Sequence, residues 1–167
     1  AMSEPQVYVN GKKAGEWKYG YSSFYLDITP YVYGSGKTNV LAVRLQNMEQ
    51  SSRWYPGGGI YRPVTIISTG KTAIDMWGVN AVTESIDVVD NSAIVNVSAK
   101  VVCDNSDNLI ARFILEGNGH KYQADSRVMS DKIGRAIIDV EYAGFWAPEA
   151  PTLYNLTVEL LDKGNNG

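Results

Sequence analysis

The strongest constraint in this sequence is the two-residue alternation of apolar and polar side chains along most of the chain. Residues 93–101 place Ala or Val at every second position, and residues 153–161 do the same with Tyr, Leu and Val. Side chains of a β-strand point alternately to the two faces of a sheet, so this period predicts strands with one buried face. No window carries the 3.6-residue apolar stripe of an amphipathic helix. We therefore predict an all-β fold of sandwich or barrel type.

Shorter runs with the same character complete the predicted set of strands. Asn10-Gly11 directly follows an alternating run and is typical of a two-residue hairpin turn. Polar clusters at residues 104–108 and 116–119 predict further turns. The shorter strands are expected at residues 7–9, 24–28, 41–45, 64–67, 113–115 and 135–142.

Charge and aromatic content change near Gly70. Residues 1–69 hold 7 Lys or Arg against 4 Asp or Glu, a net charge of +3, whereas residues 70–167 hold 8 against 14, a net charge of −6. Of the 18 aromatic residues, 11 lie in the first 69 positions. This asymmetry predicts two units, 1–69 and 70–167. An aromatic-rich, mildly basic first unit suits a surface for a sugar or a partner, or equally a tyrosine-rich β core.

Composition excludes several classes of function. The net charge of −3 argues against a nucleic-acid binder, and no run of 18 apolar residues exists to span a membrane. Cys103 and His120 are each the single residue of their type, so we expect no disulfide framework and no metal site. Residues 34–38 are similar to a phosphate-binding loop, but Tyr31 replaces the required glycine and a strand is expected to follow. We therefore expect no cofactor.

The densest segment, residues 47–62, carries the most functional information. Gly57, Gly58 and Gly59 permit close backbone approach, Trp54 offers a flat apolar face, and Arg53 offers a planar fork of donors. Such a segment suits the stacking of a sugar ring. It equally suits the locking of a β layer against a neighbouring domain. The residues alone name no nucleophile and no general acid.

This segment resembles a known family. Residues 52–64, Ser-Arg-Trp-Tyr-Pro-Gly-Gly-Gly-Ile-Tyr-Arg-Pro-Val, resemble the end of the N-terminal sugar-binding domain of family 2 glycoside hydrolases, the β-galactosidases, β-glucuronidases and β-mannosidases. Four other stretches are similar to family motifs in the same order. They are the Val-Asn-Gly hairpin at 7–11, Gly-Tyr-Ser-Ser-Phe with Asp-Ile-Thr at 20–29, Asn-Val-Leu-Ala-Val-Arg at 39–44, and Phe-Trp-Ala-Pro-Glu-Ala-Pro-Thr-Leu-Tyr-Asn-Leu at 145–156.

The resemblance implies a specific organisation. Residues 1–69 would be the C-terminal part of a jelly-roll domain, and residues 70–167 an immunoglobulin-like β-sandwich without its last strand. The family's catalytic barrel, with its two glutamates, lies outside this sequence. The chain is therefore expected to be a non-catalytic internal piece of a retaining glycosidase, foremost a β-galactosidase.

The resemblance also implies binding residues. Arg53 is the expected contact to a sugar hydroxyl, with Trp54 and Asn47 behind it. Some relatives carry an acidic residue where Arg53 stands, so its role does not transfer by identity. The alternative is that Arg53 and Trp54 pack the jelly roll against the barrel.

Partners follow from the same reasoning. We expect carbohydrate in the context of the full enzyme, the missing catalytic barrel, and no nucleic acid or membrane. A sandwich that is incomplete at both ends predicts self-association by strand pairing or swapping. Analogy with polymer-degrading bacterial enzymes favours a periplasmic or secreted whole protein. Two competing functions remain: a freestanding carbohydrate-binding module that uses Arg53, Trp54 and Tyr55, and an immunoglobulin-like adhesion or spacer domain.

Overall fold

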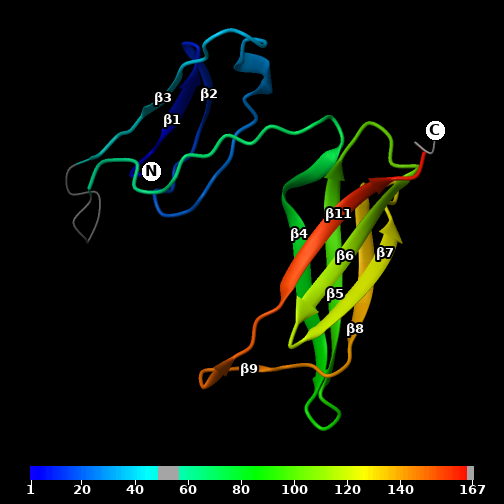
Figure 1. The fold of residues 1–167 in the computed structure, drawn as a ribbon. Coiled ribbons are helices and arrows are strands. Elements are labelled where there is room, and N and C mark those ends of the chain that lie inside the picture. Colours follow the sequence, from blue (N-terminus) through cyan, green and yellow to red (C-terminus); the bar gives the residue numbers. More distant parts are fainter. Residues whose placement is uncertain (49–56, 165–167) are drawn as a thin grey trace. The chain divides into compact units, whose positions relative to one another are not determined.

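A computed structural model of the chain describes residues 1–48 and 57–164. These residues form strands, turns and extended segments, and the one helical element among them is the 3₁₀ turn η1 (Thr29–Tyr31). The predicted all-β fold is confirmed (Figure 1). The chain divides into two compact units, unit 1 (Ala1–Ile66) and unit 2 (Ile67–Gly167).

Unit 1 is built on a small antiparallel sheet with strand order β2-β1-β3. It contains β1 (Gln6–Val9), β2 (Lys12–Glu16) and β3 (Leu41–Arg44). Val7 and Val9 on the central strand are 7% and 2% exposed, which supplies the apolar face that the alternation predicted. Asn10 and Gly11 both have positive φ, 51° and 79°, as the two central residues of a type I′ hairpin turn require.

The side chain of Asn10 does more than permit the turn. Its Nδ2 donates to the Tyr31 carbonyl oxygen at 2.9 Å and to Asn39 Oδ1 at 2.8 Å, while its Oδ1 accepts from the Val40 amide at 2.9 Å. The β1–β2 hairpin is therefore tied to the chain that enters β3.

The prediction of a strand at residues 24–28 is wrong, because this segment joins no sheet. Its apolar side chains instead cover the hairpin: the Phe24 ring stacks on Trp17 at 5.9 Å, and Leu26 lies against Gly15. Asp27 Oδ1 then accepts from the Thr29 amide at 2.9 Å, an Asx turn that starts η1. In residues 24–28, the alternation of apolar and polar residues therefore reflects side-chain packing, and the backbone is not paired in a sheet.

The predicted strand at residues 64–67 is also absent from the structure. Val64, Ile66 and Ile67 are 59%, 69% and 59% exposed, so no sheet covers this β-branched run within the described residues. High β-propensity alone does not form a strand without a partner to pair with.

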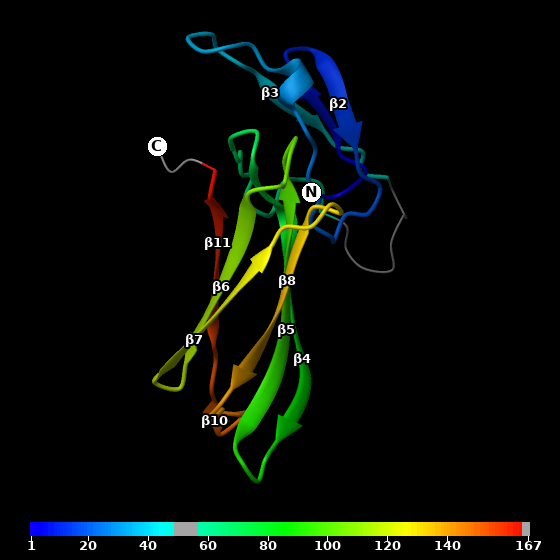
Figure 2. The same ribbon diagram turned by 90° about the vertical axis from the view of Figure 1, so that its right-hand side faces the viewer.

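Unit 2 contains the long strands, which form two three-stranded antiparallel sheets and a small hairpin (Figures 1 and 2). The sheet orders are β4-β5-β8 and β11-β6-β7, and β9 pairs with β10. The predicted strands at 93–101, 113–115, 135–142 and 153–161 are confirmed with shifted ends. The observed strands are β4 (Ala73–Asp87), β5 (Ser92–Val102), β6 (Leu109–Gly117), β7 (His120–Arg127), β8 (Ile133–Val140), β9 (Trp146–Ala147), β10 (Ala150–Pro151) and β11 (Asn155–Asp162).

One apolar core fills the space between the two sheets of unit 2. Phe113 on β6 is fully buried, and alternate residues of β5 and β8 pack in the same cluster. The predicted inward face of the last strand is confirmed, because Tyr154, Leu156, Val158 and Leu160 pack against this cluster. Its buried members are Val97, Ala99, Val101, Cys103, Leu109, Ala111, Phe113, Leu115, Val128, Ile138, Val140 and Ala143.

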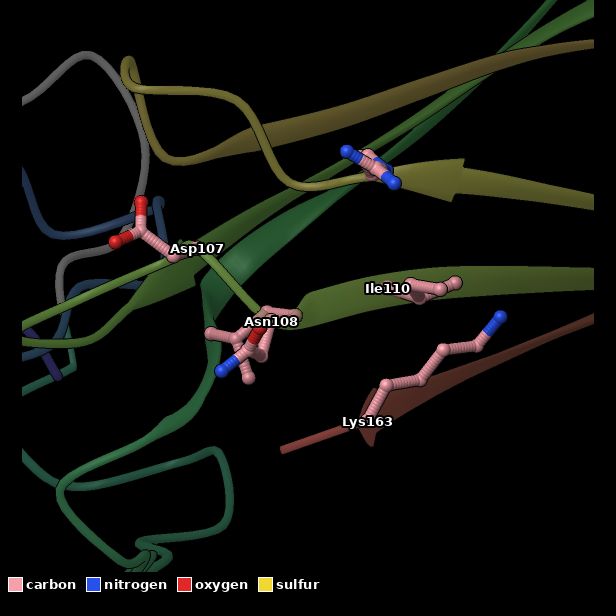
Figure 3. A pocket seen from close by; sticks show the side chains of 6 residues that line it. Asp107, Asn108, Ile110 and Lys163 are labelled. Atoms are coloured by element: carbon pink, nitrogen blue, oxygen red, sulfur yellow. The ribbon is translucent and has the colours of Figure 1, made fainter. Parts of the chain in front are cut away.

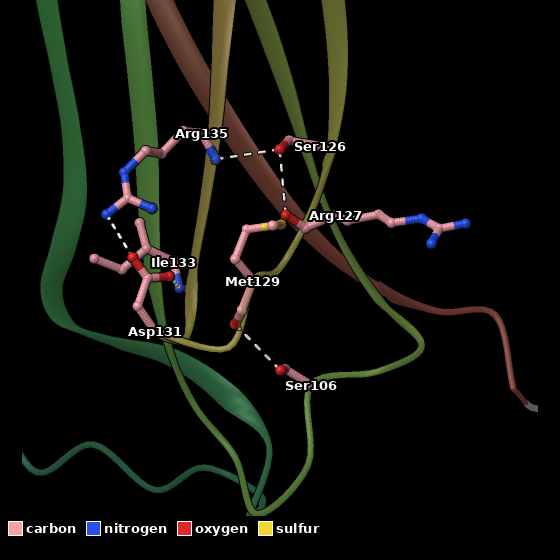
Figure 4. Close-up of polar contacts among 7 residues, drawn as sticks. All are labelled: Ser106, Ser126, Arg127, Met129, Asp131, Ile133 and Arg135. Atoms are coloured by element: carbon pink, nitrogen blue, oxygen red, sulfur yellow. Dashed lines mark hydrogen bonds and ion pairs between the residues drawn. The ribbon is translucent and has the colours of Figure 1, made fainter.

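The two sheets meet along the β7–β8 side. A Cβ on Gly134 would lie 2.6 Å from Ala111 Cβ, so a glycine is needed where β8 approaches β6. The Arg135 amide donates to Ser126 Oγ at 3.2 Å, and the Arg135 guanidinium pairs with Asp131 at 2.8 Å (Figure 4). Side-chain and backbone contacts thus close this side of the sandwich.

The outward face of the β11-β6-β7 sheet carries a charge-matched group of side chains around Arg112. Arg112 on β6 lies opposite Glu159 on β11 and Asp125 on β7, and it makes two hydrogen bonds of 2.9 Å with the Asp125 carboxylate. This bond lowers the pKa of Asp125 and raises that of Arg112.

We predict that Phe113→Ala lowers the free energy of unfolding of unit 2 by about 3–5 kcal/mol, because it leaves a cavity between the sheets. Denaturant unfolding followed by tryptophan fluorescence measures the change. Val89→Ala, at a side chain that is 83% exposed, is the control and should stay within about 0.5 kcal/mol of the parent chain.

The Asp125 ion pair predicts a pH dependence. A carboxyl whose pKa is lowered by folding contributes stability above its unfolded pKa of about 3.9, and the contribution disappears as pH falls through the folded pKa. Asp125→Asn should therefore lower the unfolding midpoint at pH 7 and have little effect near pH 2. Thermal melts of both proteins across this range test the sign, with the exposed Asp139→Asn as control. Equal losses at both pH values would contradict the prediction.

Candidate functional site

The two flanks of residues 49–56 lie side by side in unit 1. A Cβ on Gly58 would lie 3.4 Å from the Asn47 Cβ, a distance of ordinary packing contact. Asn47 itself is exposed. Asn47, which precedes this segment, and Gly58, which follows it, are therefore close to each other in space.

Residues near the N-terminus hold these flanks in place. The Met2 amide donates to the Gly59 carbonyl oxygen at 3.0 Å, and the Gly59 amide donates to the Met2 carbonyl oxygen at 3.1 Å. Ser3 Oγ donates to the Gln46 carbonyl oxygen at 2.6 Å, and the Gln46 amide donates back to the Ser3 carbonyl oxygen at 3.0 Å. Met2 and Ser3 thus bind one flank each, and we call this arrangement the N-terminal clamp.

Tyrosine rings gather beside the clamp. The Tyr61 hydroxyl donates to the Gly20 carbonyl oxygen at 2.7 Å, which joins the segment after the motif to the segment around Gly20. Tyr19 and Tyr21 on either side of Gly20 lie with ring centroids 5.7 Å apart. These three tyrosines are 62%, 48% and 51% exposed, in chain order. Exposed rings of this kind offer the flat, amphipathic faces on which sugars stack.

Of the three binding residues expected from the sequence, the structure places Asn47, at the base of the motif. Arg53 and Trp54 lie outside the described residues. Tyr19 and Tyr21 were not selected from the sequence, although Tyr21 belongs to the Gly-Tyr-Ser-Ser-Phe stretch that the resemblance used and Tyr19 directly precedes it. The clamp gave no sequence signal, because three of its four bonds use backbone groups only, which every non-proline residue carries.

The guanidinium of Arg62 lies 5.4 Å from the centroid of the Tyr61 ring, within cation–π range. It makes no ion pair in the described part of the chain. A cation beside exposed aromatic rings favours a ligand with hydroxyl or carboxylate oxygens.

Two carboxyl groups of unit 1, those of Glu16 and Asp27, have pKa values shifted in the direction opposite to that of a general acid. A hydrogen bond from Lys13 lowers the pKa of Glu16, and the side-chain and backbone hydrogen bonds of Thr29 lower that of Asp27. A catalytic acid at neutral pH needs a raised pKa. Within residues 1–48 and 57–164, no cluster of His, Cys, Asp or Glu has the geometry to hold a metal ion, and no helix is long and apolar enough to cross a bilayer.

Unit 2 carries a polar cavity of about 190 Å³ at the start of β6 (Figure 3). Arg127 and Lys163 flank Ile110, and Asp107 and Asn108 come from the turn before the strand. The lining offers charges of both signs and no pair of facing carboxyls. The turn at 104–108 agrees with the sequence prediction of a solvated turn.

Cys103, His120 and Trp146 all lie in unit 2, and none of them lies in the polar cavity. Cys103 is buried in the core of unit 2, and His120 is exposed and stacks on Tyr142 at 5.1 Å. Trp146 is 61% exposed in the two-residue strand β9, which pairs with β10.

A comparison with protein families identifies the relationship. Residues 79–167 match the model of the glycosyl hydrolases of family 2. The chain belongs to this family. The family resemblance predicted from five sequence stretches is thus confirmed.

Curated members of family 2 align over nearly the whole chain. The β-galactosidase BoGH2A of Bacteroides ovatus is 33% identical, with 93% of this chain and 19% of that protein covered. A putative β-glucuronidase of Formosa agariphila is 30% identical, with 94% and 15% covered. The chain therefore spans about a fifth of the length of the curated relatives that it matches.

Solved glycosidase structures share the fold. A glycosyl hydrolase family 2 member from Bacteroides cellulosilyticus DSM 14838 aligns with a TM-score of 0.83 at 26% identity, over 97% of this chain and 23% of that one. A β-glycosidase from Bacteroides vulgatus aligns with a TM-score of 0.81 at 23% identity, over 98% and 21%.

We predict that Tyr61→Phe lowers the free energy of unfolding of unit 1 by about 0.5–1.5 kcal/mol, because it removes the hydrogen bond to the Gly20 carbonyl oxygen. Hydrogen exchange at the amides of residues 19–21 and 57–61 should accelerate together. Tyr33→Phe, at another half-exposed tyrosine, is the matched control and should change neither quantity. Exchange that stays unchanged at residues 19–21 would contradict the role given to Tyr61.

Proposed function

We propose that this chain is a non-catalytic accessory segment of a family 2 glycosidase, and that the whole protein hydrolyses terminal β-glycosides with retention of configuration. The length ratio supports this proposal, because the relatives are about four to seven times longer than the aligned segment. β-Galactosides are the favoured substrates, since the relative with 33% identity is named a β-galactosidase.

Retaining hydrolysis needs two carboxyl groups about 5–5.5 Å apart, one of them a proton donor with a raised pKa. In the described residues, each carboxyl with a shifted pKa is shifted downward by a cation or by hydrogen-bond donors. This direction supports an accessory role, with the chemistry carried by a catalytic barrel elsewhere in the whole protein.

We assign residues 1–69 to the C-terminal part of the sugar-binding jelly roll and residues 70–167 to the immunoglobulin-like domain. The facing three-stranded sheets of unit 2 around one core support the second assignment. The small sheet of unit 1, with its Val-Asn-Gly hairpin, supports the first. The barrel and a carbohydrate substrate are the proposed partners.

The clamp is the observation that carries the proposed role of unit 1. Two backbone-paired contacts fix the flanks of the motif, and exposed tyrosines stand beside them. A binding segment held at its base loses less entropy when it contacts a ligand than an unanchored one. We propose that Arg53 contacts a sugar hydroxyl, with Trp54 and Asn47 supporting it, at the mouth of the active site.

A second function is favoured by the exposed rings of Tyr19, Tyr21 and Tyr61, which suit direct carbohydrate binding by the chain alone. Titration of the 167-residue chain with galactose, glucuronic acid and mannose discriminates. Millimolar or tighter binding that Trp54→Ala abolishes favours the binding module. An adhesion or spacer domain predicts no binding at all.

The accessory role is tested in the whole protein. Arg53→Ala should lower kcat/KM on an aryl β-galactoside about tenfold, the loss expected for one hydrogen bond to substrate. The effect should appear with the thermal midpoint unchanged, and Arg127→Ala, at an exposed arginine of unit 2, is the control. The isolated chain should hydrolyse nothing, and measurable turnover by pure chain would overturn the proposal.

A further inference from the structure

Ser3 lies opposite Gln46 beyond the end of the β1–β3 pairing, one residue out of step with it. Within the sheet, Gln6 pairs with Arg44. From this pair the chain runs from 6 to 3 on one side and from 44 to 46 on the other, so the Ser3 side contains one extra residue. Glu4, inside this insertion, has a positive φ of 45°. A bulge of this kind changes which side chain faces the neighbouring strand, and here it brings the Ser3 hydroxyl to Gln46.

The Ser3 hydroxyl takes the place that a backbone amide has in a regular antiparallel ladder. In such a ladder, two residues of a hydrogen-bonded pair exchange two N–H···O bonds. The Gln46 amide makes the first of these bonds, to the Ser3 carbonyl oxygen at 3.0 Å. The second comes from a side chain, because Ser3 Oγ donates to the Gln46 carbonyl oxygen at 2.6 Å. The second bond therefore depends on the residue type at position 3.

Ser3 is itself held in place by its neighbours in the chain. On one side, Met2 exchanges two backbone hydrogen bonds with Gly59, of 3.0 and 3.1 Å. On the other side, Pro5 is fully buried, and its carbonyl oxygen accepts from the Trp17 amide at 3.0 Å. The Ser3 hydroxyl is therefore a fixed donor in unit 1.

The carbonyl oxygen that Ser3 binds belongs to the peptide unit that joins Gln46 to Asn47. A peptide unit is planar, so the position of this oxygen sets the plane that contains the nitrogen and the Cα of Asn47. The side chain of Asn47 also lies over Gly58. A Cβ on Gly58 would be 3.4, 3.6 and 3.7 Å from the Cβ, Nδ2 and Cγ of Asn47. The backbone and the side chain of Asn47 are thus both supported.

The carboxamide of Asn47 has chemistry that suits a sugar. Within residues 1–48 and 57–164, no hydrogen bond engages this group, and the residue is exposed. A carboxamide presents a donor and an acceptor side by side, which complements two neighbouring hydroxyl groups. Such a contact depends on orientation. A residue that fixes the orientation before binding lowers the entropic cost of binding, although it does not touch the ligand.

We propose that Ser3 is a positioning residue for Asn47: its hydroxyl holds the Gln46 carbonyl oxygen and thereby directs the Asn47 carboxamide toward neighbouring hydroxyl groups of a neutral sugar. The inference rests on the proposed sugar-binding role of Asn47. Ser3 acts through the peptide unit between 46 and 47 and does not contact the substrate. The hydroxyl at position 3 therefore affects substrate binding and leaves the chemical step unchanged.

A double-mutant cycle in the whole protein tests this role. Asn47→Ala should raise KM for an aryl β-galactoside about fivefold at nearly constant kcat, the effect of one lost hydrogen bond to substrate. Ser3→Ala should raise KM about threefold, also at constant kcat. In the Asn47→Ala background it should change nothing, because no carboxamide is left to orient. Ser3→Thr keeps the hydroxyl and should restore the parent KM.

Ser106→Ala is the matched control, because it removes the same kind of bond in unit 2. The Ser106 hydroxyl donates to the Met129 carbonyl oxygen at 3.2 Å (Figure 4). This variant should keep the parent KM. Hydrogen exchange in the 167-residue chain checks the structural step separately: Ser3→Ala should accelerate exchange of the Gln46 amide, and Ser106→Ala should leave it unchanged.

The outcomes separate this inference from the proposed function. If Asn47→Ala raises KM and Ser3→Ala does not, the inference is overturned and the role of Asn47 stands. Equal increases from Ser3→Ala in both backgrounds also overturn it, because Ser3 would then act independently of Asn47. So does a KM that Ser3→Thr fails to restore. If Asn47→Ala leaves KM at the parent value, the binding role of Asn47 fails, and the inference fails with it.

Discussion

The side chain of Phe113 lies fully buried between the two sheets of unit 2, at the middle of β6. Strand β6 pairs with both β7 and β11, so its position sets the register of the whole sheet. Its inward residues reach the core, while Arg112 on the opposite face joins β11 and β7 electrostatically. A single strand thus connects apolar packing on one face to charge pairing on the other, and its central place gives the order β11-β6-β7 of its own sheet.

The sequence was most informative where one face of a strand is buried and the other is not. The runs at 93–101 and 153–161 became β5 and β11 with their predicted faces, because alternation and burial have the same cause there. It misled at 24–28, where Leu26 packs on the hairpin without a backbone partner. Periodicity reports which side chains are buried; it does not report which backbone groups are paired.

In the candidate site, too, the sequence predicted features that depend on side-chain type and missed those that depend on backbone contacts. The glycines and aromatic residues at 47–62 marked the segment, and the family relationship gave it a context. The N-terminal clamp escaped prediction, since hydrogen bonds between Met2 and Gly59 leave no pattern in side chains. The sequence also left open whether the tyrosines of the first unit form a core or an exposed surface, and the structure decides this for three of them. In unit 1, Tyr19, Tyr21 and Tyr61 leave about half of their surface open.

The bonding of Asn10 has a consequence for the chemical lifetime of the protein. An asparagine followed by glycine is prone to deamidation, in which the glycine nitrogen attacks the side-chain amide carbon and expels ammonia. In unit 1, both atoms of the Asn10 amide group are held by Tyr31, Asn39 and Val40, which keeps the amide from turning toward Gly11. Conversion to aspartate would replace a donor by an oxygen that faces two acceptor oxygens. The folded hairpin is therefore expected to slow deamidation of Asn10, and deamidated chains should arise mainly from molecules that have unfolded.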